Sequence, residues 1–349
     1  MLTKHKIINS SSNNLSEIAN NSIALVVTSP PYPMIEMWDG IFASQSEKVK
    51  VSFENNDFAS AFEEMHNVLN SIWDEVDRVT IDGGFVCINI GDATRSFNDQ
   101  FQLFSNHTKI IQYFYDKGYM VLPDIIWRKT TNAPNKFMGS GMYPAGAYVT
   151  YEHEYILIFR KGGKRIFKTE SDKMNRRKSA YFWEERNVWF SDLWDIRGTN
   201  QVMTITNSRE RSGAFPFELA YRLINMYSVK GDYVLDPFVG TGTTCFAAMA
   251  SERNSYGVEI DPVLSNEIFK NPYPLKEQLN NYVQRRLQSH INFTKEQIAQ
   301  GKDKFYQNEY HSFDVKTKQE IDVEIRFVSD IEKNDGLLIC NYQKNEGLL

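Results

Sequence analysis

The segment Leu25-Val26-Val27-Thr28-Ser29-Pro30-Pro31-Tyr32 joins an apolar run to a turn that contains two prolines. Residues 24–27 have no polar break, which predicts a short buried strand of a parallel sheet. Proline lacks an N–H and has a fixed φ, so this strand must end at Pro30. Because the residue before each proline is also kept out of the helical region, we expect a rigid turn at the carboxyl edge of the sheet, where open α/β folds bind ligands.

Three groups of this turn suit a planar ring that carries an amino group. The hydroxyl of Ser29 and the carbonyl of Pro30 are acceptors at fixed positions, and Tyr32 adds an aromatic face. A turn that only closes a strand over a packed tyrosine is the alternative interpretation of the same residues.

Apolar runs and amphipathic segments alternate along most of the chain. Strands are expected at 85–90, 121–127, 155–159, 233–236 and 256–260, and helices at 57–79, 101–117, 215–227 and 245–250. This alternation predicts an α/β fold with a parallel, doubly wound sheet. Residues 1–22 are expected to be a polar lead-in to the first strand, and residues 33–56 a mobile loop beside the turn. An ordinary surface connection with a half-buried Trp38 is the alternative for residues 33–56.

The composition is that of an ordinary globular protein: 349 residues, of which 42% are hydrophobic and 24% charged. No apolar run reaches the length of a membrane span, and the first residues lack a signal-peptide core. The cysteines Cys87, Cys245 and Cys340 form no metal pattern, so we expect no metal and a reducing cytoplasm. His153 stands between two glutamates, and we expect a structural or substrate-orienting role for it rather than a metal site.

A net charge of −5 excludes a uniformly basic protein but leaves room for a local basic surface. Residues 160–178 contain nine Lys or Arg against two acids, and aromatic residues are frequent from there to residue 205. Cations bind phosphates and aromatic rings stack on bases, so this segment predicts a nucleic-acid surface. A solvated charged face is the alternative. The cations that we expect to contact DNA are Lys164, Arg165, Lys168, Arg176, Arg177 and Lys178.

Residues 233–250 follow the order strand, glycine loop, helix, which is typical of a nucleotide-type cofactor site. Asp236 ends the strand, Gly240 and Gly242 allow close approach of the backbone, and Glu259 ends the next strand 23 residues after Asp236. A dinucleotide-binding loop would have a third glycine, and a phosphate-binding loop would have a lysine after its last glycine. This segment has neither the third glycine nor the lysine.

Two motifs of the chain resemble those of the amino-group DNA methyltransferases. Residues 28–32 are similar to their catalytic motif, in the Ser-Pro-Pro-Tyr form typical of cytosine-N4 enzymes; adenine-N6 enzymes usually carry Asp or Asn at the place of Ser29. Residues 236–244, Asp-Pro-Phe-Val-Gly-Thr-Gly-Thr-Thr, are similar to their S-adenosylmethionine loop. The catalytic motif precedes this loop and the basic region lies between them, which is the order of the β class.

The resemblance implies a Rossmann-like, mostly parallel sheet of the S-adenosylmethionine-dependent methyltransferase type, with an inserted target-recognition region and a C-terminal α+β extension. The implied segments are a catalytic half, a target-recognition region, a cofactor-binding half and an extension of unknown role, at 1–159, 160–205, 206–261 and 262–349. The implied catalytic residues are Ser29, Pro30, Pro31 and Tyr32. The implied cofactor-binding residues are Thr28, Phe215, Pro216, Asp236, Pro237, Phe238, Gly240, Gly242, Thr243 and Glu259.

The implied activity is methyl transfer from S-adenosylmethionine to the N4 amino group of a cytosine flipped out of double-stranded DNA. Such an enzyme would belong to a restriction-modification system, with a cognate endonuclease that acts on the same site. Three alternatives stay open: an adenine-N6 enzyme of the same fold, an RNA or protein-amide methyltransferase, and a DNA-binding module with a vestigial cofactor site.

Overall fold

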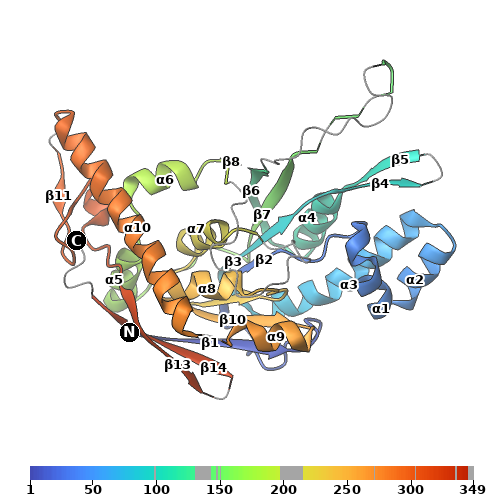
Figure 1. Ribbon diagram of the computed structural model, residues 1–349, viewed down its shortest axis with the longest axis horizontal. Helices are drawn as coiled ribbons and strands as arrows, with labels where there is room; N and C mark the ends of the chain where they lie inside the picture. The colour runs from blue at the N-terminus through green and yellow to red at the C-terminus, as the bar shows by residue number, and fades with distance from the viewer. Residues whose placement is uncertain are drawn as a thin grey trace.

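The structure is a computed structural model, and it describes residues 1–97, 100–129, 143–146, 148–149, 151–196, 215–270, 272–302, 304–334 and 336–344. Ten strands of these residues form one sheet in the order β13-β14-β1-β10-β9-β2-β3-β7-β6-β8, and helices cover both of its faces (Figure 1). The strands of this sheet are β1 Leu2–Asn9, β2 Ile23–Thr28, β3 Thr80–Ile90, β6 Met120–Arg128, β7 His153–Arg160, β8 Leu193–Trp194, β9 Tyr233–Asp236, β10 Asn254–Glu259, β13 Phe327–Asn334 and β14 Leu337–Gln343.

Two small hairpins and a set of helices complete the described chain. The hairpin strands are β4 Ala93–Phe97 with β5 Gln100–Phe104, and β11 Tyr306–Gln307 with β12 Asp314–Val315. The helices are α1 Asp39–Gln45, α2 Glu47–Glu54, α3 Phe58–Val79, α4 Asn106–Asp116, α5 Glu170–Lys178, α6 Trp183–Trp189, α7 Phe217–Tyr227, α8 Thr243–Ala250, α9 Pro262–Ile268 and α10 Pro272–Ala299, with short 3-10 helices at Glu36–Trp38 and Lys318–Glu320. Among these helices, none combines the length and the apolar character that crossing a membrane requires.

β2 lies in the middle of the sheet, and all six of its residues are buried. It pairs in parallel with β3 on one side and with β9 on the other. β10 and β1 continue the parallel order beyond β9. The carboxyl ends of β2, β3, β9 and β10 therefore meet at one edge of the sheet, although the strands come from opposite parts of the chain.

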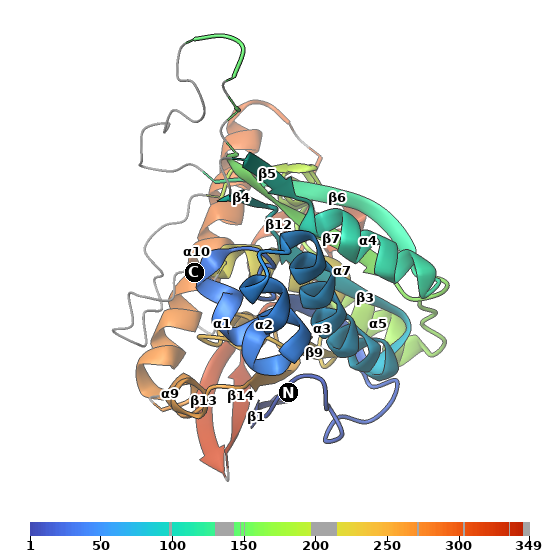
Figure 2. The ribbon, with the colours of Figure 1, turned by 90° about the vertical axis from the view of Figure 1, so that its right-hand side faces the viewer.

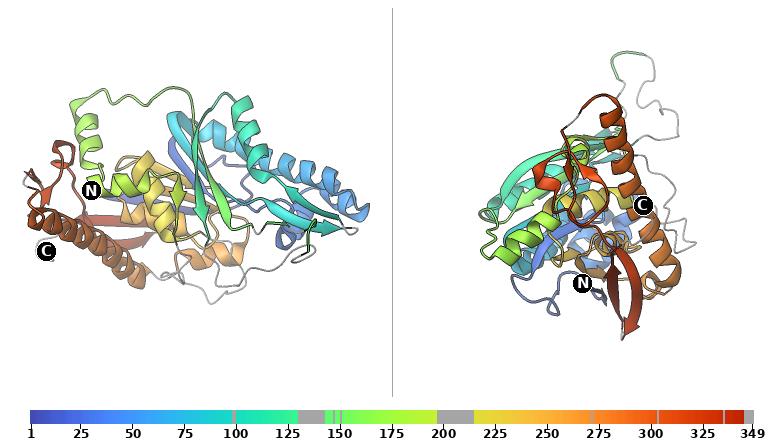
Figure 3. Two further views of the ribbon diagram at one scale, coloured as in Figure 1. Left: turned by 90° about the horizontal axis from the view of Figure 1, so that it is seen from above. Right: turned by 90° about the vertical axis from the view of Figure 1, so that its left-hand side faces the viewer.

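Each face of the sheet has its own apolar core. α3 and α4 pack on one face through residues such as Trp73 and Phe114, and α7, α8 and α10 pack on the other through Leu219, Phe246 and Leu279. Figure 2 shows α1, α2 and α3 together on one side of the molecule, and Figure 3 shows α10 on the side away from them. The sheet is thus covered on both faces, as in other doubly wound folds.

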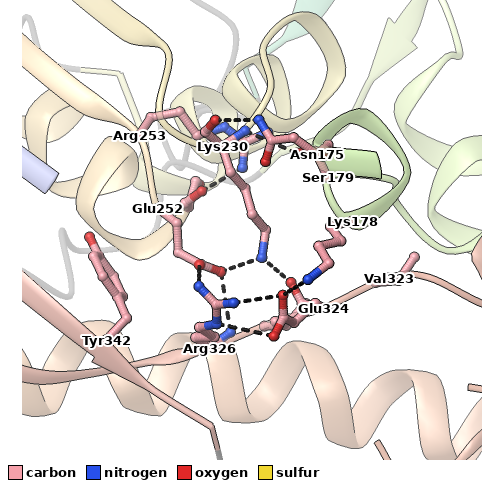
Figure 4. Close-up of polar contacts among 12 residues, drawn as sticks. Asn175, Lys178, Ser179, Lys230, Glu252, Arg253, Val323, Glu324, Arg326 and Tyr342 are labelled. Carbon is pink, nitrogen blue, oxygen red and sulfur yellow. Dashed lines mark hydrogen bonds and ion pairs between the residues drawn. The ribbon is translucent and has the colours of Figure 1, made fainter. Parts of the chain in front are cut away.

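The C-terminal segment is part of this sheet, because β14 pairs with β1 and β13 with β14. A buried polar cluster also fixes the segment to the core (Figure 4). Lys230 donates to Glu252 at 2.5 Å and to the main-chain carbonyl of Glu324. The Glu324 carboxylate in turn pairs with Lys178 of α5 at 3.2 Å and with Arg326 at 2.7 Å. Helix α5, the loop before β9 and the C-terminal segment therefore meet at one place.

The strands predicted at 24–27, 85–90, 121–127, 155–159, 233–236 and 256–260 are confirmed as β2, β3, β6, β7, β9 and β10, and the helix predicted at 57–79 is confirmed as α3. The direction of one strand is not the expected one: β7 runs antiparallel to both of its neighbours, β3 and β6.

Three local predictions are wrong. Residues 33–56 hold α1 and α2 instead of a loop, because Phe42 and Val49 are buried against the core. The helix expected from residue 101 begins at Asn106, since residues 100–104 form β5. Residues 1–22 contain β1. Its inward-facing side chains Thr3 and His5 are polar, so the segment lacks the apolar pattern from which a strand is predicted.

Candidate active site

A pocket of about 540 Å³ opens at the carboxyl edge of the parallel strands. Ser29, Pro30, Pro31 and Tyr32 line it, directly after β2. The loop that follows β9 lines the same pocket, although it lies about 200 residues later in the sequence. The structure therefore brings the two predicted motifs to one site, and the volume is in the range of small-molecule pockets.

The predicted cofactor residues mostly converge on this pocket. Those that line it are Phe215, Asp236, Pro237, Phe238, Gly240, Thr243 and Glu259. Thr28 is buried and donates to Asp236, and Pro216, the N-cap of α7, lines the adjoining cavity between α6, α7 and α10. Gly242 is the N-cap of α8.

Asp236 joins the two halves of the site. Its carboxylate accepts hydrogen bonds from the hydroxyls of Thr28 and Thr244, each at 2.6 Å, and from the backbone N–H of Phe238 at 3.0 Å. Burial raises the pKa of Asp236 to about 6, and the three donors act against this rise. The carboxyl group is thus held in place between β2 and α8.

Two glycines and a carboxylate shape the predicted cofactor loop, which follows β9. Gly240 and Gly242 have φ of +52° and +90°, which favour glycine. A Cβ on Gly242 would lie 2.6 Å from Cγ2 of Ile268, so the loop also needs the small residue for space. Glu259 accepts from the backbone N–H of Gly240 at 3.1 Å and from that of Asp261 at 2.9 Å. A glycine cradle ending at a helix start, with an acid on the next strand, fits a nucleoside cofactor.

Tyr32 is fixed by residues that the sequence analysis did not select. Its hydroxyl contacts Ser29 Oγ at 3.1 Å and donates to Glu154 Oε2 at 2.9 Å. The Asn89 side chain donates to Tyr32 at 2.8 Å and to Glu154 at 2.6 Å, and Lys129 donates to the other oxygen of Glu154. Burial and the charge of Glu154 raise the pKa of Tyr32 well above its ordinary value.

Asn89 and Glu154 left only a weak signal, as single polar residues within or beside apolar strands. His153, which the sequence singled out, does not line the pocket; its ring lies against Tyr151 and Tyr155. The residue of this pair that contacts the predicted catalytic motif is therefore Glu154, which is hydrogen-bonded to Tyr32.

The six predicted DNA-binding cations are not at this site. β7 carries the chain from the pocket edge to the opposite, amino-end edge of the parallel strands, and the basic segment begins there. Arg165 pairs with Asp232 at 2.6 Å just before β9, and Lys178 pairs with Glu324. Lys164, Lys168, Arg176 and Arg177 are exposed at that edge. Their contact with DNA stays a prediction, which this placement does not support.

Some aromatic residues of the basic region are buried in the core and others are exposed. Phe182, Trp189 and Trp194 are buried in the core, so they are not exposed to stack on bases, whereas Trp183 and Phe190 are partly exposed. Residues 197–205 of the expected target-recognition region lie outside the described residues.

Comparison with known proteins agrees with this site. A family model described as DNA methylase matches residues 23–271. The type II methyltransferase M.MthZI of Methanothermobacter thermautotrophicus is 50% identical over 335 residues, which cover 95% of this chain and 93% of that protein. The type II methyltransferase M.MjaI of Methanocaldococcus jannaschii is 47% identical over 281 residues, which cover 76% of this chain and 91% of that protein.

Solved structures share the architecture. A candidate DNA modification methylase of Thermus thermophilus, TTHA0409, crystallised with S-adenosyl-L-methionine, superposes with a TM-score of 0.60 at 28% identity and covers 79% of this chain and 94% of its own. The cytosine-N4-specific PvuII DNA methyltransferase has the same fold, with a TM-score of 0.52 at 18% identity, covering 80% of this chain and 92% of its own.

The chain belongs to the DNA methylase family of N4 and N6 amino-group methyltransferases. It is an S-adenosylmethionine-dependent DNA methyltransferase of the type II kind, built on the mixed α/β fold of these enzymes.

Proposed function

We propose that this enzyme methylates the N4 amino group of cytosine in double-stranded DNA. The observation that carries the base assignment is Ser29, which lines the pocket with Pro30 and Tyr32 in the Ser-Pro-Pro-Tyr form. When bound, S-adenosylmethionine supplies an electrophilic methyl group on a sulfonium. The residues that would hold it are those of the glycine cradle, with Asp236 and with Glu259 at the ribose.

The exocyclic amine is a poor nucleophile because its lone pair is delocalised into the ring. Ser29 Oγ and the Pro30 carbonyl accept the two amino hydrogens, which draws the nitrogen toward tetrahedral geometry and aims its lone pair along the direction of transfer. Tyr32 stacks on the base. Because these groups line a pocket, the target base must leave the duplex to reach them, and we propose base flipping.

Mass spectrometry of nucleosides tests the base assignment. The protein is incubated with unmethylated genomic DNA and S-adenosylmethionine, and the hydrolysed product is analysed, with a reaction lacking the protein as control. We expect N4-methylcytosine. N6-methyladenine as the product would overturn the cytosine assignment and leave the family activity intact.

The type II relatives motivate two further parts of the proposal: a specific DNA site shared with a cognate restriction endonuclease, and a cytoplasmic location. The three cysteines are unpaired and buried, which suits a reducing compartment. Mapping the methylated positions in the treated DNA tests the first part, since methylation spread over unrelated sequences would contradict it.

A further inference from the structure

A chain of hydrogen bonds leads from the wall of the pocket to an ion pair in which the carboxylate is buried and the lysine is partly exposed. It runs from Ser29 Oγ to the Tyr32 hydroxyl at 3.1 Å and from there to Glu154 Oε2 at 2.9 Å. Lys129 binds the other carboxylate oxygen of Glu154, which is 8% exposed. Asn89 Nδ2 braces the chain by donating to Tyr32 at 2.8 Å and to Glu154 at 2.6 Å.

The number of protons fixes the direction of every bond in this chain. A carboxylate only accepts, so the single proton of Tyr32 goes to Glu154. The phenol oxygen then has only lone pairs left, and it accepts from Asn89 and from Ser29. Ser29 therefore donates to Tyr32. Asn89 Nδ2 also lies 3.5 Å from Ser29 Oγ, at the limit of a hydrogen bond, so Ser29 Oγ keeps lone-pair capacity on its side away from Tyr32 and Asn89.

The hydrogen bonds that Asn89 donates leave its own side-chain oxygen without a partner in the described part of the chain. Its Oδ1 is buried and has no hydrogen-bond partner among the described residues, although a lost buried bond is unfavourable. Turning the amide over would place this oxygen against Glu154 Oε2, which is also an acceptor, and would remove the N–H that Tyr32 now accepts. The amide thus keeps both N–H groups on Tyr32 and Glu154 at the expense of its oxygen.

We propose that Glu154 is a positioning residue that makes Ser29 an obligate acceptor toward the amino group of the target base, with Lys129 holding the carboxylate in place. This role rests on amino-group methyl transfer and applies to cytosine and adenine alike. If Glu154 did not take the proton of Tyr32, the phenol could donate to Ser29, whose own proton would then point at the amino hydrogens.

The isosteric variant Glu154→Gln tests the direction of the chain. With its oxygen toward Tyr32, the new amide points its NH₂ at the Lys129 ammonium; turned over, it donates to Tyr32 and reverses the chain. We expect kcat, measured as methyl incorporated into unmethylated genomic DNA, to fall about 30- to 100-fold with unchanged affinity for S-adenosylmethionine. The matched control is Glu152→Gln, which changes a partly exposed neighbour paired with Arg128 at 3.7 Å and should keep the wild-type kcat.

A second variant distinguishes a reversed direction of the hydrogen-bond chain from structural damage. Lys129→Met in the Glu154→Gln background removes the ammonium, so the amide can turn its oxygen to Tyr32 and its NH₂ to the pocket. We expect at least a tenfold recovery of kcat over Glu154→Gln alone. Purely structural roles would instead make the two losses add. A wild-type kcat in Glu154→Gln, or a double variant no faster than Glu154→Gln, would overturn the proposal.

Tyr32→Phe provides an independent test if Glu154→Gln does not fold. It keeps the ring but removes the acceptor of the Ser29 proton, so kcat should fall by a similar factor, and an unchanged kcat would overturn the proposal. The product of every reaction is identified by nucleoside mass. N6-methyladenine in the wild-type reaction would sink the cytosine assignment, whereas the ratios of kcat between variants decide the role of Glu154.

Discussion

Asp236 makes the stability of the molecule depend on pH. Its pKa is about 6 in the folded protein, whereas an aspartate of an unfolded chain titrates near 3.9. The folded state therefore holds this proton more tightly than the unfolded state does. The resulting stabilisation is complete below about pH 4 and is lost as the pH rises through about 6.

Asp236→Asn should remove this dependence. We expect the free energy of unfolding of the variant to rise relative to the wild type by about 2 kcal/mol between pH 4 and pH 7, in the absence of cofactor. Chemical denaturation across that pH range measures the difference. Asp82→Asn, at an exposed position, serves as the control and should show no such trend; an equal trend in both variants would contradict the assignment to Asp236.

Gly242 is a residue whose size and conformation both bear on the cofactor loop. Gly242→Ala adds a Cβ at a φ of +90° and 2.6 Å from Ile268, so we expect lower stability and weaker binding of S-adenosylmethionine. Gly118→Ala is the matched control, because Gly118 has a φ of +80° but nothing within 4 Å of the new atom. It should lose about 1 kcal/mol of stability and keep its affinity. Calorimetric titration with S-adenosylmethionine measures the affinity of both variants. Equal affinities would show that the loop tolerates the alanine side chain at residue 242.

At the scale of elements, the cluster of Figure 4 holds the C-terminal segment to the rest of the sheet. The Lys230 side chain is only 6% exposed and its partner Glu252 only 3%. Removing one member of a buried pair leaves an uncompensated charge. Lys230→Met should therefore lower the free energy of unfolding by about 3–5 kcal/mol.

An exposed pair gives the comparison for this prediction. Lys270→Met breaks a contact with Glu267 whose lysine side chain is 60% exposed, and we expect a loss below about 1 kcal/mol. Thermal or urea unfolding measures both variants. Similar losses in the two would mean that the buried cluster does not fasten the segment.

At the scale of the whole molecule, the sheet separates the pocket from the basic segment. Lys168 and Arg177 are exposed at the amino-end edge, away from Ser29 and Asp236. We therefore expect Lys168→Ala combined with Arg177→Ala to keep the wild-type salt dependence of DNA binding. DNA-binding titrations at several salt concentrations test this expectation. If the slope of log K against log salt concentration were smaller by about two in the double variant, the sequence-based prediction of phosphate contacts would hold after all.

The sequence predicted the central strands and the two motifs at their ends, because apolar runs that stop at a proline or glycine turn are local signals. It did not predict where the basic segment lies, since that depends on the direction of β7. No helix was predicted between the strands at 121–127 and 155–159, and a parallel pair would have needed a crossover there. Asn89 and Glu154 were missed because their role exists only through Tyr32.

The position of β1 has a consequence for how the protein is made. β1 is synthesised before the other described strands of the sheet, yet its neighbours β10 and β14 come about 250 and more than 330 residues later in the sequence. At roughly 5–20 residues per second on the ribosome, β1 waits on the order of 10–50 s for its first partner strand. The nascent chain therefore carries an open strand edge for most of its synthesis, and we expect its yield to depend on chaperones more than that of a protein built from local hairpins.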